Sequence, residues 1–219
     1  FYGSHDMASV VEICNMALAH LGQAPNIASI NPPEGSAEAE LCKIYYPMAR
    51  DNVLEMHNWS FATKRALLPQ LETSIQQWRY AYAVPDDLLK ATSLIANDAV
   101  SDTGYVGFDG KNVCYSPQDY TIEADSEERL VLYSNQEKAL LIYQARIEDT
   151  TKFSALFTTT LVWHLASILA GPIIKGESGR AEAKRCEQMM MAYFFKAVSV
   201  DSAQRKVTLS QVPSSIAVR

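Results

Sequence analysis

The sequence has few of the features that mark a metal-binding protein. Its four cysteines, Cys14, Cys42, Cys114 and Cys186, are far apart, and none forms the close-spaced ligand pair typical of structural zinc sites. In a reducing compartment such cysteines are usually small buried hydrophobic residues. We therefore expect no metal site.

Long apolar runs are also missing. None reaches the roughly 18 residues that span a bilayer, and the longest candidate, Leu161 to Ile174, is interrupted by His164 and Gly171-Pro172. We expect no membrane association. The first residues, FYGSHD (1–6), resemble an expression-tag remnant, and no basic and apolar leader follows Met7, so we expect folding in a cytoplasm.

The charge balance argues against a DNA-binding surface. Lys and Arg number 19 against 25 Asp and Glu, which gives a net charge of −6, and no basic run is present. Affinity for duplex DNA depends on Lys and Arg neutralising phosphates. A wall past which DNA moves without being held is compatible with this charge.

Catalytic signatures are missing as well. The sequence contains no G-x-S-x-G elbow and no H-E-x-x-H pair. The run GPIIKGES (171–178) has Glu177 where a phosphate-binding loop needs lysine, so we predict a turn between helices. We expect no cofactor and no enzymatic activity, although a His57 base paired with Asp51 or Glu55 stays open as an alternative.

Helical periodicity marks both ends of the chain. Residues 8–21 form one predicted helix, and a second begins after Ser36 as N-cap, kinks at Pro47 and ends near His57. Two more are predicted at about 153–171, ended by Gly171-Pro172, and at about 180–198.

Strand-like patterns fill the middle. The run WRYAYAVP predicts a strand with Trp78, Tyr80 and Tyr82 on one side, and YTIEA, RLVLYS and KALLIYQARI predict further strands. Pro85-Asp86-Asp87 predicts a turn and N-cap, and Asp109-Gly110 a tight turn.

The expected fold class is α+β. The N- and C-terminal helix pairs (7–68 and 149–200) are predicted to form one helical bundle. A small antiparallel β module (69–148) is inserted between them, and a flexible tail (201–219) follows, because it has no apolar stripe to bury.

The stretch YYPMARDNVLEMHNWSFATKRALL (45–68) lies where the helical part hands over to the β module. Trp59 and Phe61 are expected to bury this joint, and the adjacent Arg50 and Asp51 to face different ways with separate partners. The predicted structural joint residues are Pro47, Arg50, Asp51, Trp59, Phe61 and Trp78.

These segments resemble a known family. EICNMALAHLGQAPNIASI, GSAEAELCKIYYPMARDNVLEMHNWSFATKRALL and WRYAYAVPDDLLK, within residues 12–90, are similar to the head-to-tail adaptors of short-tailed bacteriophages, the tail tubular protein A family. The shared patterns are a helix ending in Leu-Gly, a Tyr-Pro-x-x-Arg-Asp core, a Trp-x-Phe-Ala joint and a Trp-x-Tyr-x-Tyr-x-x-Pro strand. None of these patterns is catalytic.

The resemblance implies a structural virion protein at the head–tail junction, made in the bacterial host cytoplasm. About twelve copies would form a ring between the portal protein and the distal tail tube or nozzle protein, and DNA would only pass through the channel. The tail from about Gln204 to Arg219 is expected to dock on the portal. The predicted portal-binding residues are Arg205, Lys206, Val207, Leu209, Val212 and Ile216.

Two alternatives stay open. A polysaccharide-degrading hydrolase of the phage tail would need two carboxylates facing each other across a cleft. The candidates Asp86, Asp87, Asp109 and Glu123 are not selected by any spacing. The other alternative is an intracellular oligomer unrelated to phage.

Overall fold

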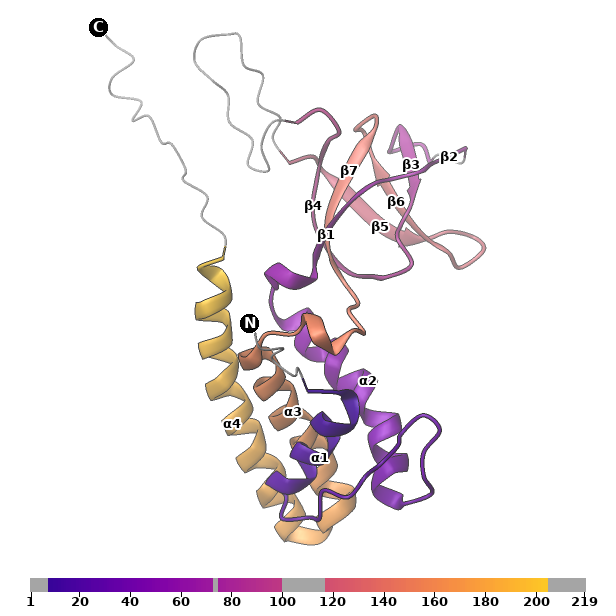
Figure 1. Ribbon diagram of the computed structural model, residues 1–219. Coiled ribbons are helices and arrows are strands. Elements are labelled where there is room, and N and C mark those ends of the chain that lie inside the picture. Colours follow the sequence, from indigo (N-terminus) through magenta and orange to yellow (C-terminus); the bar gives the residue numbers. More distant parts are fainter. Residues whose placement is uncertain (1–7, 73–74, 100–116, 205–219) are drawn as a thin grey trace, which may run out of the picture.

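The computed structural model describes residues 8–72, 75–99 and 117–204 (Figure 1). The protein is α+β, as the sequence predicts, with its helices gathered in one part and its strands in another (Figure 1). The helices are α1 (Val10–His20), α2 (Ala37–Met56), α3 (Ala155–Ile174) and α4 (Gly176–Ser202), with short 3₁₀ helices η1 (Ser60–Ala62) and η2 (Thr150–Lys152).

Helix α3 is the centre of the helical part. It packs against α1, α2 and α4, and residues of all four helices share one hydrophobic core. By length and composition α3 could cross a membrane, although half of its apolar window is buried inside the protein. A helix that contacts three others is expected to be apolar on most of its surface, so burial accounts for this composition.

The beginnings of α1 and α2 follow the predicted capping chemistry. Ser36 Oγ accepts a hydrogen bond from the Ala39 N–H at 3.2 Å, which confirms Ser36 as N-cap. Ser9 and Glu12 form a capping box at the start of α1. Helix α2 then runs uninterrupted through Pro47 to Met56.

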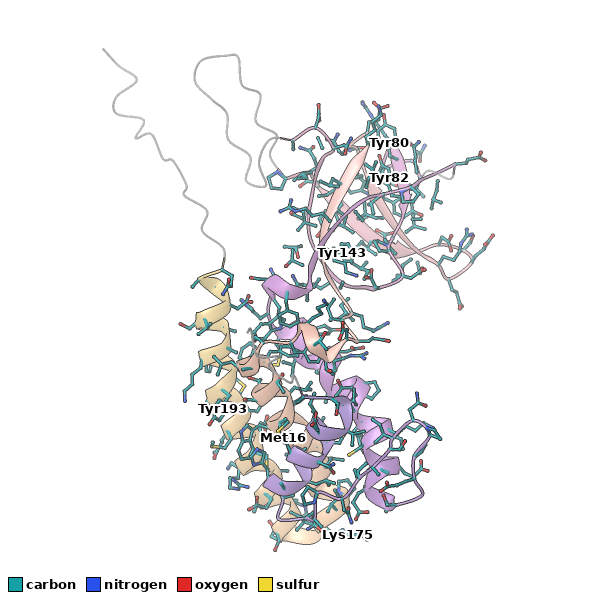
Figure 2. All side chains as sticks on the ribbon, viewed as in Figure 1. Met16, Tyr80, Tyr82, Tyr143, Lys175 and Tyr193 are labelled. Carbon is teal, nitrogen blue, oxygen red and sulfur yellow. The ribbon has the colours of Figure 1, made fainter. Side chains whose placement is uncertain are left out.

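The predicted end of α3 is wrong. The helix continues through Gly171-Pro172 to Ile174, because a proline in the last turn removes one hydrogen bond without preventing the turn from closing. The reversal is made by Lys175 and Gly176, with φ angles of 63° and 61°. Lys175 lies at the end of the helical part that is remote from the strands (Figure 2).

Helix α4 is longer than predicted at both ends. It begins at Gly176 rather than near Arg180, and it ends at Ser202 rather than near Val198. Asp201, which the sequence assigned to the tail, is therefore helical. The segment 205–219 lies outside the described residues.

The strands form two antiparallel sheets that pack face to face. Tyr82 of one sheet and Tyr143 of the other belong to the same buried cluster, with Leu94, Leu132 and Leu141 (Figure 2). The three-stranded sheet has the order β1-β7-β4 (Thr63–Leu67, Ala139–Ala145, Leu88–Ala96). The four-stranded sheet has the order β2-β3-β6-β5 (Gln70–Leu71, Tyr80–Ala83, Leu130–Ser134, Tyr120–Ala124).

The predicted strands at YTIEA, RLVLYS and KALLIYQARI are confirmed as β5, β6 and β7. The boundary expected at Leu68 is too late, because Thr63–Leu67 is strand β1 and pairs with β7. The turn at Asp86-Asp87 is confirmed, but strand β4 follows it and not a helix. Asp109-Gly110 lies outside the described residues.

Trp78 does not occupy the predicted strand position. It forms an isolated bridge with Ile75 and precedes β3 (Tyr80–Ala83). Its ring packs on the cluster of Ala81, Val131 and Tyr133, whereas Tyr82 points to the interior between the sheets. The alternation of aromatic residues therefore does not extend back to Trp78.

Candidate functional site

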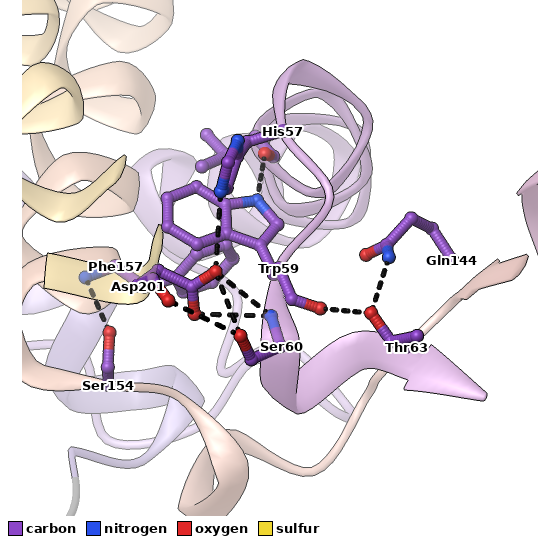
Figure 3. Close-up of polar contacts among 9 residues, drawn as sticks. His57, Trp59, Ser60, Thr63, Gln144, Ser154, Phe157 and Asp201 are labelled. Carbon is purple, nitrogen blue, oxygen red and sulfur yellow. Dashed lines mark hydrogen bonds and ion pairs between the residues drawn. The ribbon is translucent and has the colours of Figure 1, made fainter. Parts of the chain in front are cut away.

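The polar residues of the stretch 45–68 converge where the helices meet the strands. The joint is the region formed by residues 57–63, 144–154 and 201–204, which come from the end of α2, the chain leaving β7 and the end of α4 (Figure 3). Both ends of the β part enter the helical part here.

Trp59 is the hydrophobic centre of the joint. Its side chain is 0% exposed, and its Nε1–H donates to the Val53 carbonyl at 2.8 Å. Phe157 and Phe194 meet the indole nearly edge-on, with centroids at 5.1 and 6.1 Å, and Phe61 lies at 6.0 Å. Such edge-on contacts add to the stabilisation from burial. Trp59 and Phe61 thus lie in the helical core, at its border with the β part.

Asp201 fastens the end of α4 to the start of η1. Its two carboxylate oxygens accept the Ser60 N–H at 3.1 and 3.0 Å, and Oδ2 also accepts the Ser60 hydroxyl at 3.2 Å (Figure 3). His57 Nε2 lies 3.3 Å from the same oxygen. Hydrogen bonds to a carboxylate are stronger than those between neutral groups. The cluster therefore ties residues that are 141 positions apart.

Ser60, His57 and Asp201 do not form a catalytic triad. In a triad the serine hydroxyl donates to the histidine, and the aspartate holds the opposite imidazole nitrogen. Here the hydroxyl and the backbone N–H of Ser60 both donate hydrogen bonds to the Asp201 carboxylate. His57 Nε2 lies beside the same carboxylate and not beside the serine hydroxyl in the role of a base. The arrangement has the geometry of a clamp, and it leaves the serine without a base.

Arg50 and Asp51 belong to one network, contrary to the prediction of separate partners. Arg50 Nε donates to Asp51 Oδ1 at 2.9 Å, and Arg146 Nε donates to Asp51 Oδ2 at 2.9 Å. Arg50 is 7% exposed. Its side chain is long enough to fold back on its neighbour, so Asp51 joins α2 to the chain that leaves β7.

A second ion pair holds the β part together beside the joint. Lys64 Nζ lies 2.6 Å from Asp87 Oδ2, and the Tyr143 hydroxyl donates to Oδ1 at 2.9 Å. Burial opposes ionisation of Asp87, but these hydrogen bonds outweigh it and lower the pKa of the carboxyl. Burial and the bond to Asp87 raise the pKa of Tyr143 to about 12.

A cleft of about 510 Å³ separates the end of α4 from the three-stranded sheet. Gln144 lines it with 0% exposure, and its Nε2–H donates to Thr63 Oγ1 at 2.8 Å. Within the described part of the chain, Gln144 Oε1 and Thr92 Oγ1 are buried without a hydrogen-bond partner. Buried polar atoms of this kind commonly bind ordered water.

The carboxylates considered for glycan hydrolysis are not brought together as a free pair. Asp87 is held by Lys64 and Tyr143, and Glu123 Oε1 accepts the Thr121 hydroxyl at 3.0 Å. Asp86 is exposed in the turn before β4, and Asp109 lies outside the described residues.

The buried cysteines agree with the prediction where they can be seen. Cys14, Cys42 and Cys186 are 0% exposed and free, and Cys114 lies outside the described residues. The sequence does not predict that Cys14 and Cys42 lie together. The hydrogen bond between the two thiols raises the pKa of Cys14 and lowers the pKa of Cys42. Across residues 8–72, 75–99 and 117–204, no group of three or more His, Cys, Asp or Glu side chains could hold a metal.

The predicted site residues thus divide into three groups. Arg50, Asp51, Trp59 and Phe61 lie at or beside the joint, whereas Pro47 is exposed on α2 and Trp78 lies in the β part. The predicted portal-binding residues, Arg205, Lys206, Val207, Leu209, Val212 and Ile216, lie outside the described residues.

No protein-family model and no curated protein matches the chain.

Proposed function

We propose that this chain is the head-to-tail adaptor of a short-tailed bacteriophage, a structural protein of the virion. Copies of it form a ring between the portal protein and the distal tail, and the ring extends the channel through which DNA passes. The bundle of N- and C-terminal helix pairs builds the ring. The β part faces the distal tail protein, and the segment after Gln204 docks on the portal.

The observation that carries this proposal is the exposure of large apolar side chains on two different helices. Ile44 and Met48 on α2 are 64% and 45% exposed, and Phe195 on α4 is 64% exposed. Single exposed apolar residues are common, but Ile44 and Met48 are neighbours on one helix face. Two different apolar faces on one chain favour head-to-tail association, which forms a ring when the rotation from one copy to the next closes.

The polar chemistry of the joint supports a structural role. Asp201, Asp51 and Asp87 each hold residues that are distant in the sequence, and the net charge of −6 suits a channel wall that does not grip DNA. A rigid connection between helices and strands would let one ring present both a portal-facing and a tail-facing surface.

Native mass spectrometry tests this function. We expect the chain alone to be a monomer, and to become a ring-sized complex when the portal protein of the same genome is added. A monomer that ignores the portal at every salt concentration contradicts the proposal.

A truncation lacking residues 205–219 tests the role of the C-terminal segment. It keeps Gln204, whose N–H donates to the Asp201 carbonyl at 2.9 Å, so the end of α4 should remain intact. We expect portal binding to be lost while the thermal midpoint is retained. A second variant, Leu209→Asp in the full chain, changes one predicted portal-binding residue without shortening the segment. It should also weaken portal binding. Unchanged binding by the truncated chain would refute portal docking by this segment.

A further inference from the structure

The outward faces of α2 and α4 have matching positions. Buried residues of α2, such as Cys42 and Val53, and buried residues of α4, such as Cys186 and Ala197, point toward the shared core. The opposite faces are exposed and point away from α3. On α2 this face carries Glu40, Ile44, Met48 and Glu55, and on α4 it carries Lys184, Gln188, Ala192, Phe195 and Ser199.

One contact sets the relative height of the two helices. Both helices run toward the β part (Figure 1), and His57 just after α2 touches Asp201 in the last turn of α4 at 3.3 Å. Residues counted back equally from this contact therefore lie at similar heights, since each helical residue rises about 1.5 Å. Glu40 lies 17 residues before His57, and Lys184 lies 17 residues before Asp201.

Heights decide which residues meet in a ring. Rotation about an axis parallel to the helices carries one copy onto the next without changing height, whereas an open filament shifts it. In a ring whose axis runs along α2 and α4, the α2 face of one copy therefore meets the α4 face of the next at equal height. Met48 and Ala192, each nine residues before the contact, would then lie opposite each other.

Charge and shape agree with this register. Glu40 is opposite Lys184, and among the described residues neither forms an ion pair within its own chain. The long Met48 side chain is opposite the small Ala192, and Phe195 reaches the level between Met48 and Glu55. Pairing large with small side chains lets two helices pack closely.

We propose that the α2 face of one copy packs in parallel against the α4 face of a second copy, with Glu40 on Lys184 and Met48 on Ala192. The proposal rests on the ring-forming function above and specifies its contact. Every contact around the ring is then the same, because each subunit offers its α2 face to one neighbour and its α4 face to the other.

Disulfide trapping in the complex with the portal protein tests the register. A chain with Met48→Cys and Ala192→Cys, in a Cys114→Ser background, should give a ladder of multimers on a non-reducing gel after mild oxidation. The matched control is Met48→Cys with Ala181→Cys, which moves the second cysteine 11 residues down the same face of α4, roughly 16 Å. It should give no ladder. The remaining cysteines are buried and should not react.

A charge exchange provides a second readout. Glu40→Lys and Lys184→Glu should each weaken assembly about five-fold per contact, and the double variant should restore it to within about two-fold. Normal assembly of both single variants, or a ladder from the displaced cysteine pair, overturns the register but leaves the adaptor function standing. If the single variant Met48→Cys cross-links to the portal protein, the α2 face binds the portal and not a second copy. That result also overturns the register. Failure of the unmodified chain to assemble overturns both proposals.

Discussion

The helical part and the β part bury their apolar side chains in different ways. Four helices enclose one core centred on α3, and its aromatic cluster extends to the joint through Trp59. The β part has a smaller core between two short sheets, to which the central strand β7 contributes Leu141 and Tyr143. Since both ends of the β part enter the helical core, the helices provide the support on which the strands are held.

The largest effect should come from two of the three tryptophans, Trp59 in the helical part and Trp78 in the β part. Trp59→Ala removes a fully buried ring from the helical core and should lower the free energy of unfolding by about 3–5 kcal/mol. Trp78→Ala removes a half-buried ring from the outer cluster of the β part and should cost about 1–2 kcal/mol. Urea unfolding followed by circular dichroism measures both. Equal losses would show that the two cores contribute alike.

A smaller effect is expected at the connection between the parts. Asp201→Asn keeps one carbonyl oxygen but removes the negative charge that Ser60 and His57 contact. We expect the free energy of unfolding to fall by about 1–2 kcal/mol. Amide exchange at Ser60 should accelerate, while exchange in the centre of α3 should not change. The control is Asp86→Asn in an exposed turn, which should change neither rate. A slow Ser60 amide in the Asp201 variant would mean that the connection does not depend on this carboxylate.

The smallest effect concerns pH and the β part alone. The pKa of Asp87 is lowered in the folded protein, so its stabilising contribution is present above its ordinary value of 3.8 and is lost as pH falls through the folded pKa. Asp87 and Lys64 are partly exposed, so the loss should stay below about 1 kcal/mol. Urea midpoints at pH 6 and pH 3 should differ less in Asp87→Asn than in the unmodified chain. An identical difference would exclude Asp87 as a source of acid sensitivity.

Local chemistry explains what could be predicted from the sequence. The Ser36 cap and the strands β5, β6 and β7 depend on neighbouring residues, so spacing and residue type were sufficient. The error at Gly171-Pro172 arose because a proline can sit in a last turn as well as after it. The sequence pattern places Thr63–Leu67 in the helical part, although it is strand β1. Its pairing partner β7 lies far along the chain, so no local pattern reveals the strand.

The site depended on contacts that no local pattern reveals. The position of Trp59 and Phe61 where the helical pattern gives way to strand patterns marked the joint, but nothing near Asp201 in the sequence indicated Ser60 as its partner. The same holds for Arg146 on Asp51 and for the pairing of Cys14 with Cys42. Side chains that come from different helices and loops are brought together by the packing of whole elements, which no local pattern records.

The hydrogen bonds between Asp201 and Ser60 have a mechanical consequence. Helix α4 ends at Ser202, one residue beyond the carboxylate that holds Ser60, and Ser60 lies three residues before strand β1. Tension applied to the following residues is therefore shared between the axis of α4 and the backbone at Ser60. A pull from any body attached at that end reaches the strands directly, without first being transmitted through the core around α3.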